Sequence, residues 1–377
     1  MNHIGKIAAK LDEYNLDAML VTSPPGERYA VGFHGEGLAL ISKEDCWYFT
    51  DSRYIEAAEK EISGAHIACV GGGKSHRDLA AQVVREHRLE RVGFESDRMS
   101  VDALERYQQV LDCTLLAAPG LISGLRAAKD GEELARMRRA QEVTDRVFAN
   151  ILDFIRPGIT EREVSARLVY DMMRMGAEKP SFDPIAAAGA NGSMPHAVPG
   201  NTVLENGMFL TMDFGCVYEG YCSDMTRTVA VGQPTDEMRR VYDTVLRAQL
   251  AGLAAAKAGV PGCAVDRAAR SVIEQAGYGA YFGHSLGHSL GLEIHESPNF
   301  SPSEQAVMPV GAVVSCEPGI YLPGRFGVRI EDVVVLTETG CENLTASPKE
   351  LIVVENAAKN LLETKQSPCQ SRGNRVK

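Results

Sequence analysis

Two acidic residues of this sequence stand where their neighbours predict buried β-strands. Asp213 directly follows the strand-like residues 209–212, and Asp224 lies beyond a turn at residues 218–220. A hairpin at this turn would fold the two carboxylates toward one another. Burying a carboxylate costs free energy unless the group is paired or bound to a cation. The hairpin therefore predicts a charged centre inside the fold.

A second hairpin repeats this arrangement further along the chain. Glu317 follows the strand-like residues 313–316, and Glu331 lies beyond a glycine-rich stretch. One such residue could be paired by an arginine, but Arg227 and Arg329 carry too little positive charge for four buried carboxylates. The matched hairpins therefore favour bound metal ions over salt bridges alone.

The histidines support the same interpretation. Four of the nine lie in short glycine-containing segments: His196, His284, His288 and His295. Imidazole and carboxylate groups together suit divalent first-row metals, and one histidine with four carboxylates is typical of two adjacent ions. Such a pair can activate a water molecule and polarise a carbonyl group. The remaining histidines could then donate hydrogen bonds to a developing oxyanion or relay protons.

Composition excludes several classes of function. The formal charge is −11, from 39 basic and 50 acidic side chains, which argues against a nucleic-acid partner. The nine cysteines are irregularly spaced with no CxxC pair, so we expect reduced, mostly buried thiols and no zinc ribbon or disulfide framework. The first 21 residues lack the continuous apolar core of a signal peptide, and no apolar run reaches membrane-spanning length. We therefore expect a cytoplasmic protein with no membrane partner.

The elements that position these residues fall into two parts, as the length of 377 residues suggests. Residues 1–125 alternate helices with short strands, which predicts a small α/β domain. Helices are predicted at residues 4–14, 78–89 and 101–110, and strands at residues 18–21, 38–41, 47–50, 65–70 and 92–94. The polar-aromatic clusters at residues 28–33 and 50–54 are expected to serve packing.

Beyond residue 126 an order of two helices and two strands occurs twice. The first helices are predicted at residues 132–155 and 236–258, each followed by a Pro-Gly break and a second helix. One of these second helices begins at Thr160, which forms a capping-box signature with Glu163; the other covers residues 265–276. Strands follow at residues 208–214 and 221–231, and again at 312–317 and 328–336. We interpret this as an internal two-fold pseudo-repeat in which each half donates acidic residues to one central site.

Four segments carry a resemblance to a known family. Residues 212–228, 284–296, 317–321 and 329–331 resemble the proline-specific metallopeptidases of the pita-bread fold, aminopeptidase P and prolidase. The resemblance covers residues 1–357. It implies an α+β fold in which a C-terminal pita-bread domain of the creatinase/aminopeptidase kind, with an internal pseudo-two-fold, follows a smaller creatinase-type α/β domain. The expected boundaries are residues 1–125, 126–358 and a polar tail at 359–377.

The resemblance also implies a set of metal ligands. These are Asp213, Asp224, His288, Glu317 and Glu331. Asp224 and Glu331 would bridge two divalent ions, Asp213 would complete the coordination of one, and His288 with Glu317 that of the other. Manganese is the expected metal, with cobalt or zinc as alternatives. Ser289 departs from the glycine that many relatives carry after the ligand histidine, and it could reshape the pocket wall.

Further roles follow from the same likeness. His196 and His295 would contact the substrate and the transition state, and His284 would line the proline end of the site. Glu317 would handle a proton, and Arg329 would orient the carboxylates. For His284 the alternative role is a purely structural hydrogen bond.

The expected function is metal-dependent hydrolysis of the bond between an N-terminal residue and a following proline. The substrates would be small peptides with proline in second position, and the enzyme would be a homodimer. The sequence leaves open whether it is a dipeptidase or an aminopeptidase. The alternatives are a broader-specificity or methionine aminopeptidase on the same fold, a metal-free creatinase-like amidinohydrolase and a non-enzymatic peptide-binding module.

Overall fold

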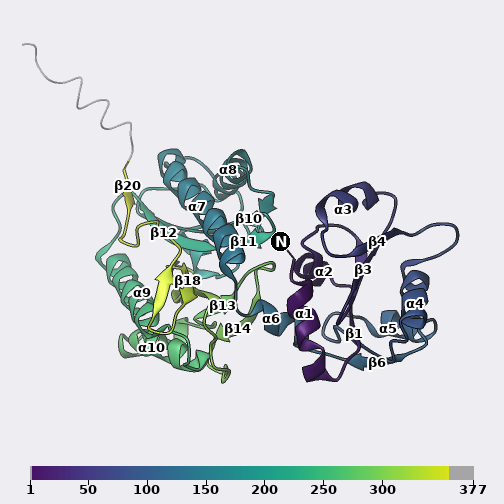
Figure 1. Ribbon diagram of the computed structural model, residues 1–377. Coiled ribbons are helices and arrows are strands. Elements are labelled where there is room, and N and C mark those ends of the chain that lie inside the picture. The colour runs from purple at the N-terminus through teal and green to yellow at the C-terminus, as the bar shows by residue number, and fades with distance from the viewer. Residues whose placement is uncertain (1, 356–377) are drawn as a thin grey trace, which may run out of the picture.

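The computed structural model of the chain describes residues 2–355. Figure 1 shows two parts that meet at the short helix α6 (Leu121–Arg126). We call the part up to the end of α6 the N-terminal domain. The part that starts at the long helix α7 (Gly131–Phe154) is the C-terminal domain. The predicted tail at residues 359–377 lies outside the described residues.

A six-stranded mixed sheet forms the centre of the N-terminal domain. Its strands are β1 (Ala18–Val21), β2 (Gly37–Ser42), β3 (Cys46–Thr50), β4 (His66–Cys69), β5 (Arg91–Phe94) and β6 (Thr114–Ala117), in the spatial order β4-β3-β2-β1-β5-β6. The surrounding helices are α1 (Ile4–Lys10), α2 (Pro24–Val31), α3 (Ile55–Glu61), α4 (His76–Glu86) and α5 (Val101–Gln108). All four residues of β1 are buried, because helices cover both faces of the sheet.

The N-terminal helices differ from the predicted ones in detail. The helix predicted at residues 4–14 ends at Lys10, and a 3₁₀ turn (Asp12–Tyr14) follows, closed by Asn15 in the left-handed region at φ 55°. Helices α2, α3 and α6 were not predicted. Helix α2 shows why: Ser23 caps it and prolines open it, but its eight residues carry no clear apolar periodicity.

The C-terminal domain contains four long helices and several small sheets. The helices are α7, α8 (Glu161–Arg174), α9 (Asp236–Ala255) and α10 (Gly262–Gln275). The strands of its first half are β7 (Lys179–Pro180), β8 (Ile185–Ala188), β9 (Met208–Phe214), β10 (Cys216–Tyr218), β11 (Tyr221–Cys222) and β12 (Met225–Val231). Those of its second half are β13 (Gly287–Ser289), β14 (Glu296–Phe300), β15 (Val313–Cys316), β16 (Gly319–Leu322), β17 (Phe326–Arg329), β18 (Asp332–Leu336), β19 (Cys341–Asn343) and β20 (Val353–Val354).

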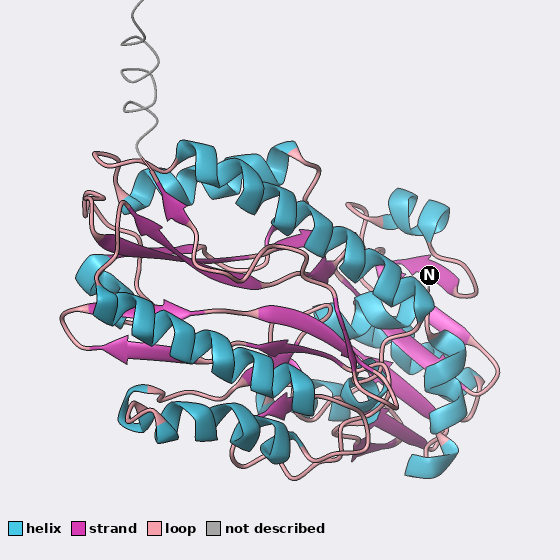
Figure 2. Cartoon of the chain, turned by 90° about the vertical axis from the view of Figure 1, so that its left-hand side faces the viewer, coloured by secondary structure: helices cyan, strands magenta, loops and turns pink. Residues whose placement is uncertain are grey.

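The two halves share one topology. In the first half, two helices (α7, α8) precede three antiparallel neighbours in the order β8-β9-β12. In the second half, α9 and α10 precede β13-β15-β18, paired in the same antiparallel way. A small hairpin is inserted at the same place in each half, β10–β11 in one and β16–β17 in the other. Figure 2 shows the long helices packed over the strands. The predicted internal repeat is thus present in the topology.

The capping box at Thr160 is confirmed. Its hydroxyl accepts a hydrogen bond from the Glu163 amide, while the Glu163 carboxylate accepts from the Thr160 amide. Asp130 and Glu133 form the same box at the start of α7. Among the described residues, no helix is long and apolar enough to cross a membrane.

Two predicted strands are interrupted, and each interruption falls at a predicted ligand. The strand predicted at residues 221–231 is divided into β11 and β12 around Asp224, and the strand predicted at 328–336 is divided into β17 and β18 around Glu331. The two pieces belong to different sheets in each case. Of the four carboxylates only Asp213 lies inside a strand, so the prediction of four strand residues is wrong for the other three. Because the side chains of a strand alternate between its two faces, a break frees Asp224 and Glu331 from that alternation.

Candidate metal centre

All nine residues singled out in the sequence line one cavity. The cavity has a volume of about 530 Å³ and lies within the C-terminal domain. Its lining includes His196, Asp213, Asp224, His284, His288, His295, Glu317, Arg329 and Glu331. The pseudo-repeat explains why the carboxylates meet. The pair β9 and β12 positions the two carboxylates of the first half, and the equivalent pair β15 and β18 positions those of the second half beside them.

The predicted ligands approach one another closely. Ligand atoms of Asp224, His288 and Glu331 all lie within 4.8 Å of one another. The Nε2 atom of His288 lies 3.4 Å from Oε1 of Glu317 and 3.6 Å from Oδ2 of Asp224. One divalent cation could bridge groups at such separations, since metal–ligand distances near 2 Å bring ligand atoms about 3 Å apart.

Three buried carboxylate oxygens are particularly informative. Within residues 2–355 no group donates a hydrogen bond to Oδ1 of Asp213, Oδ1 of Asp224 or Oε1 of Glu331. Buried acceptors in native proteins are almost always satisfied, and each unsatisfied one needs a physical reason. A divalent ion supplies that reason, because carboxylate oxygens are preferred ligands of hard and borderline cations. The donor set therefore fits divalent metal ions.

The protonation preferences of these carboxylates agree with a cation site. Burial, followed by repulsion from Glu331 and Asp213, raises the pKa of Asp224 well above its ordinary value. Burial and repulsion from Glu317 likewise raise the pKa of Glu331. Burial also raises the pKa of Glu317. Ionised carboxylates are thus costly here, and bound cations would offset that cost.

His288 is oriented as a ligand. Its Nδ1 atom donates to the backbone carbonyl of Ser289 at 3.2 Å, which leaves the lone pair of Nε2 facing Asp224 and Glu317. Burial lowers the pKa of His288, so the neutral ring is favoured. Ser289 itself is not part of the cavity lining. Its hydroxyl donates to the carbonyl of Pro298, so the expectation that it reshapes the pocket wall is not met.

Arg329 organises one side of the centre. Its Nη2 atom donates to Oδ2 of Asp213 at 2.6 Å, and its Nε atom donates to the Thr226 hydroxyl at 3.0 Å. Its Nη1 atom donates to the hydroxyl of Tyr321 at 2.9 Å, and that hydroxyl lies 2.8 Å from Nε2 of His284. The expectation that Arg329 orients a carboxylate agrees with this geometry. His284 is also held on its other side, where Nδ1 contacts the Ser285 carbonyl at 2.8 Å.

Two further histidines face the cavity with fewer contacts. His196 and His295 are both exposed to it. The ring of His295 packs edge to face on that of His288 at 4.4 Å between centroids. Burial, followed by repulsion from His288, lowers the pKa of His295. Both rings can contact a substrate in the cavity, whereas both nitrogens of His284 and Nδ1 of His288 contact protein groups.

Comparison with known proteins decides the family. The model of metallopeptidase family M24 matches residues 135–338, and the creatinase/prolidase N-terminal domain matches residues 3–128. The chain belongs to metallopeptidase family M24.

Relatives of this M24 chain match more than nine tenths of its length. An uncharacterized peptidase of Bacillus subtilis (strain 168), YqhT, is 42% identical over 93% of this chain and 99% of the relative. The solved structure of the Xaa-Pro dipeptidase from Bacillus anthracis has a TM-score of 0.89 and 41% identity, covering 93% of this chain and 98% of that one. The X-Pro aminopeptidase of Thermotoga maritima MSB8 has a TM-score of 0.87 and 37% identity, with coverage of 92% and 100%. The predicted family and fold class are confirmed, and the chain is a metallopeptidase that uses divalent ions.

The M24 centre also contains residues that the sequence did not single out. Thr226 donates to Oε2 of Glu331 at 2.7 Å, and Ser315 donates to Oε1 of Glu317 at 2.9 Å. Tyr321 connects Arg329 to His284. Each lies within five residues of a predicted ligand or within its motif, but sequence proximity alone does not show which way a side chain points.

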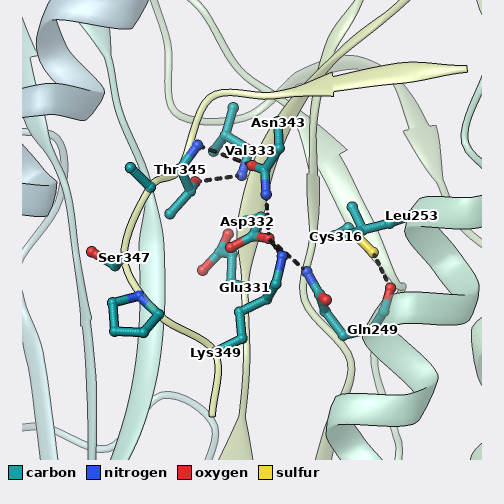
Figure 3. Close-up of polar contacts among 12 residues, drawn as sticks. Gln249, Leu253, Cys316, Glu331, Asp332, Val333, Asn343, Thr345, Ser347 and Lys349 are labelled. Carbon is teal, nitrogen blue, oxygen red and sulfur yellow. Dashed lines mark hydrogen bonds and ion pairs between the residues drawn. The ribbon is translucent and has the colours of Figure 1, made fainter.

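Asp332 is another residue that the sequence did not single out. It directly follows Glu331 and has no exposed surface. Its carboxylate accepts hydrogen bonds from Gln249 at 3.0 Å, Asn343 at 2.7 Å and Lys349 at 2.6 Å, as Figure 3 shows, and from Arg227 at 2.8 Å. We call these five residues the Asp332 hub. Arg227 also donates to the backbone carbonyl of Glu331, so the hub fixes the chain that carries this carboxylate in the M24 centre.

Proposed function

We propose that this M24 peptidase hydrolyses the bond between an N-terminal residue and a following proline. The observation that carries the proposal is one cavity whose lining includes the four predicted carboxylates, Asp183 and four histidines. Solved relatives of comparable length include an Xaa-Pro dipeptidase and an X-Pro aminopeptidase. Their full-length coverage supports transfer of this activity, because both the N-terminal and the C-terminal domain are shared.

We propose Asp213, Asp224, His288, Glu317 and Glu331 as the ligands of two divalent ions. The buried oxygens without a protein partner support this assignment for Asp213, Asp224 and Glu331, and the free Nε2 lone pair supports it for His288. When bound, the ions would supply Lewis acidity to the scissile carbonyl and to the attacking water. Arg329, in the cavity lining, and Thr226, outside it, each donate a hydrogen bond to one of these carboxylates and hold it in place.

The other side chains would act on the substrate directly. His196 and His295 are exposed to the cavity and could donate hydrogen bonds to the oxyanion that forms on the scissile carbonyl. Glu317 lines the same cavity and could accept a proton from the attacking water and deliver it to the departing proline nitrogen. In the peptide this nitrogen carries no hydrogen, so a site that relies on a substrate N–H at this bond would fail.

Three finer expectations stay predictions: manganese as the metal, a homodimeric assembly and a cytoplasmic location. The carboxylate-rich donor set supports manganese, with cobalt and zinc as alternatives. The choice between dipeptidase and aminopeptidase also stays open.

A matched set of peptides tests the proposed function. We expect Mn²⁺-dependent hydrolysis of Ala-Pro, of Ala-Pro-Ala or of both, no hydrolysis of Ala-Ala and Ala-Ala-Ala, and loss of activity with chelator. Cleavage of the dipeptide alone would define a dipeptidase, and cleavage of the tripeptide an aminopeptidase.

Other outcomes of this assay favour the alternatives. Cleavage of Met-Ala-Ser but not of the proline peptides would favour a methionine aminopeptidase. Activity on creatine that survives chelation would favour an amidinohydrolase. Binding of peptides without turnover, unchanged in an Asp224→Ala variant, would favour a binding module.

A further inference from the structure

Within residues 2–355 the N-terminal domain supplies no residue to the lining of the cavity, yet it contacts the segment that carries His295. All residues that line the cavity belong to the C-terminal domain. His295 lies at the end of the turn 290–295, which joins β13 to β14. The pairing of these two strands is irregular, with Gly287 opposite Phe300 but Ser289 opposite Glu296. Strand pairing alone therefore constrains this turn weakly.

Glu296, the residue next to His295, is held by buried cations. Its side chain is only 5% exposed. Oε1 accepts from Nη2 of Arg126, the last residue of α6, and Oε2 accepts from Nζ of Lys129 at 3.1 Å. The side chains of Arg126 and Lys129 are 6% and 1% exposed. Both cations come from the end of the N-terminal domain and the connection that follows it.

The turn closes over this carboxylate. The backbone amide of Glu293 donates to Oε1 of Glu296 at 3.1 Å. A Cβ atom at Gly291 would lie 2.8 Å from the same oxygen, so only glycine allows this approach. Glu293 adds a second contact, since its carboxylate accepts from Arg126 at 2.8 Å and from Arg98 at 2.7 and 2.8 Å. The conformation of the turn is thus built around the Glu296 carboxylate.

The buried charges of Glu296, Arg126 and Lys129 favour one conformation of the turn 290–295. Buried ion pairs add little stability compared with apolar packing, but removing one partner leaves an uncompensated charge and is strongly destabilising. Here two buried cations converge on one carboxylate, so a displacement of Glu296 would take this partner from Lys129 and leave Arg126 with Glu293 alone. The network therefore disfavours other conformations of the turn.

We propose that Glu296, Arg126 and Lys129 form a clamp that positions His295, and that the N-terminal domain acts on the chemistry through it. The proposal rests on the proposed function, in which His295 contacts the substrate. Glu296 lies outside the cavity lining and is a positioning residue. Through the clamp a domain without catalytic groups fixes one of the two histidines that are free to meet the substrate.

A double-mutant cycle tests whether Glu296 acts through His295. We would measure kcat and KM with Ala-Pro for wild type, Glu296→Gln, His295→Ala and the double variant, all loaded with Mn²⁺. We expect Glu296→Gln to lower kcat at least tenfold in wild type and less than twofold in the His295→Ala background. Glu56→Gln, an equal charge change on an exposed helix of the N-terminal domain, should leave kcat unchanged. Equal losses in both backgrounds, or a fully active His295→Ala variant, would overturn the proposal.

Hydrogen–deuterium exchange supplies a readout that does not depend on activity. We expect the amides of residues 291–295 to exchange at least tenfold faster in Glu296→Gln, with exchange in α9 unchanged. Unchanged exchange in the turn would overturn the clamp even if no peptide were cleaved. If Glu296→Gln does not fold, the second variant is Lys129→Met, which removes one cation and keeps the aliphatic stem. We expect the same amides to exchange faster in this variant, by a smaller factor than in Glu296→Gln. Unchanged exchange of these amides in Lys129→Met would count against the clamp. If the proposed function were wrong, the wild-type protein would not hydrolyse Ala-Pro, but the amides of residues 291–295 would still exchange faster in Glu296→Gln.

Discussion

Buried carboxylates are stabilised in two different ways in this molecule. In the C-terminal domain, Asp224 and Glu331 each present an oxygen that no described residue satisfies, which indicates cations. In the N-terminal domain, Glu27 is 3% exposed and accepts a hydrogen bond from the hydroxyl of Tyr48 at 3.2 Å. Burial, with some repulsion from Glu95, raises the pKa of Glu27 to about 8. At neutral pH we therefore expect the carboxyl group of Glu27 to be stabilised by a bound proton and not by a cation.

Glu27 makes the stability of the N-terminal domain depend on pH. Between its unfolded pKa near 4.5 and its folded pKa of about 8, the folded state keeps a proton that the unfolded state has lost. Stability therefore falls as the pH rises through this window, and Glu27→Gln removes the dependence. The free energy of unfolding of the variant minus that of wild type should be larger at pH 9 than at pH 5, by on the order of a few kcal/mol.

The fluorescence of the single tryptophan, Trp47 in β3, reports unfolding of this domain directly. Urea unfolding at pH 5, 7 and 9 gives the comparison. Parallel pH profiles for the two proteins would show that Glu27 is ionised in the folded state, against this account.

At the scale of elements, the sequence predicted helices better than strands. The long helices of the C-terminal domain follow from their periodicity and from capping residues such as Thr160, whose chemistry is local. The strands containing Asp224 and Glu331 were predicted as continuous, because the breaks depend on which sheet each piece joins. For the same reason the sequence placed the carboxylates near one another but could not identify Tyr321 or Asp332, whose contacts come from distant segments.

The Asp332 hub should be essential for the element that carries Glu331. Asp332→Asn removes the charge that pairs the buried Arg227, and an uncompensated buried charge typically costs 3–5 kcal/mol, so a loss of about 3 kcal/mol in unfolding free energy is expected. Unfolding by urea, followed by far-ultraviolet circular dichroism on chelator-treated protein, measures this loss without a contribution from bound metal.

Glu342→Gln is the matched control for Asp332→Asn. It disrupts the exposed pair of Glu342 with Arg138, and its cost should stay below about 1 kcal/mol. If the two variants were equally stable, the hub would not support the segment between β17 and β18 that carries Glu331.

Two topologically equivalent halves form one cavity, and a separate N-terminal domain contributes no described residue to the lining of that cavity. The halves show little residue-level similarity, so the sequence suggested their equivalence only through the order of elements and the positions of the carboxylates. The structure adds the matching strand neighbours, β8-β9-β12 and β13-β15-β18. It also shows the contact of α6 with the turn that carries His295, which sequence patterns could not predict because its residues are far apart in the chain.

The most direct test of the central claim is the number of metal ions that each chain binds. Protein stripped with chelator, reloaded with Mn²⁺ and desalted should contain two manganese ions per chain by elemental analysis. Asp224→Asn should retain fewer than one, because Asp224 is proposed to contact both ions, whereas Asp51→Asn in the N-terminal domain should retain two. One ion or none in wild type at saturating Mn²⁺, or two ions in Asp224→Asn, would contradict a dinuclear centre built by both halves of the repeat.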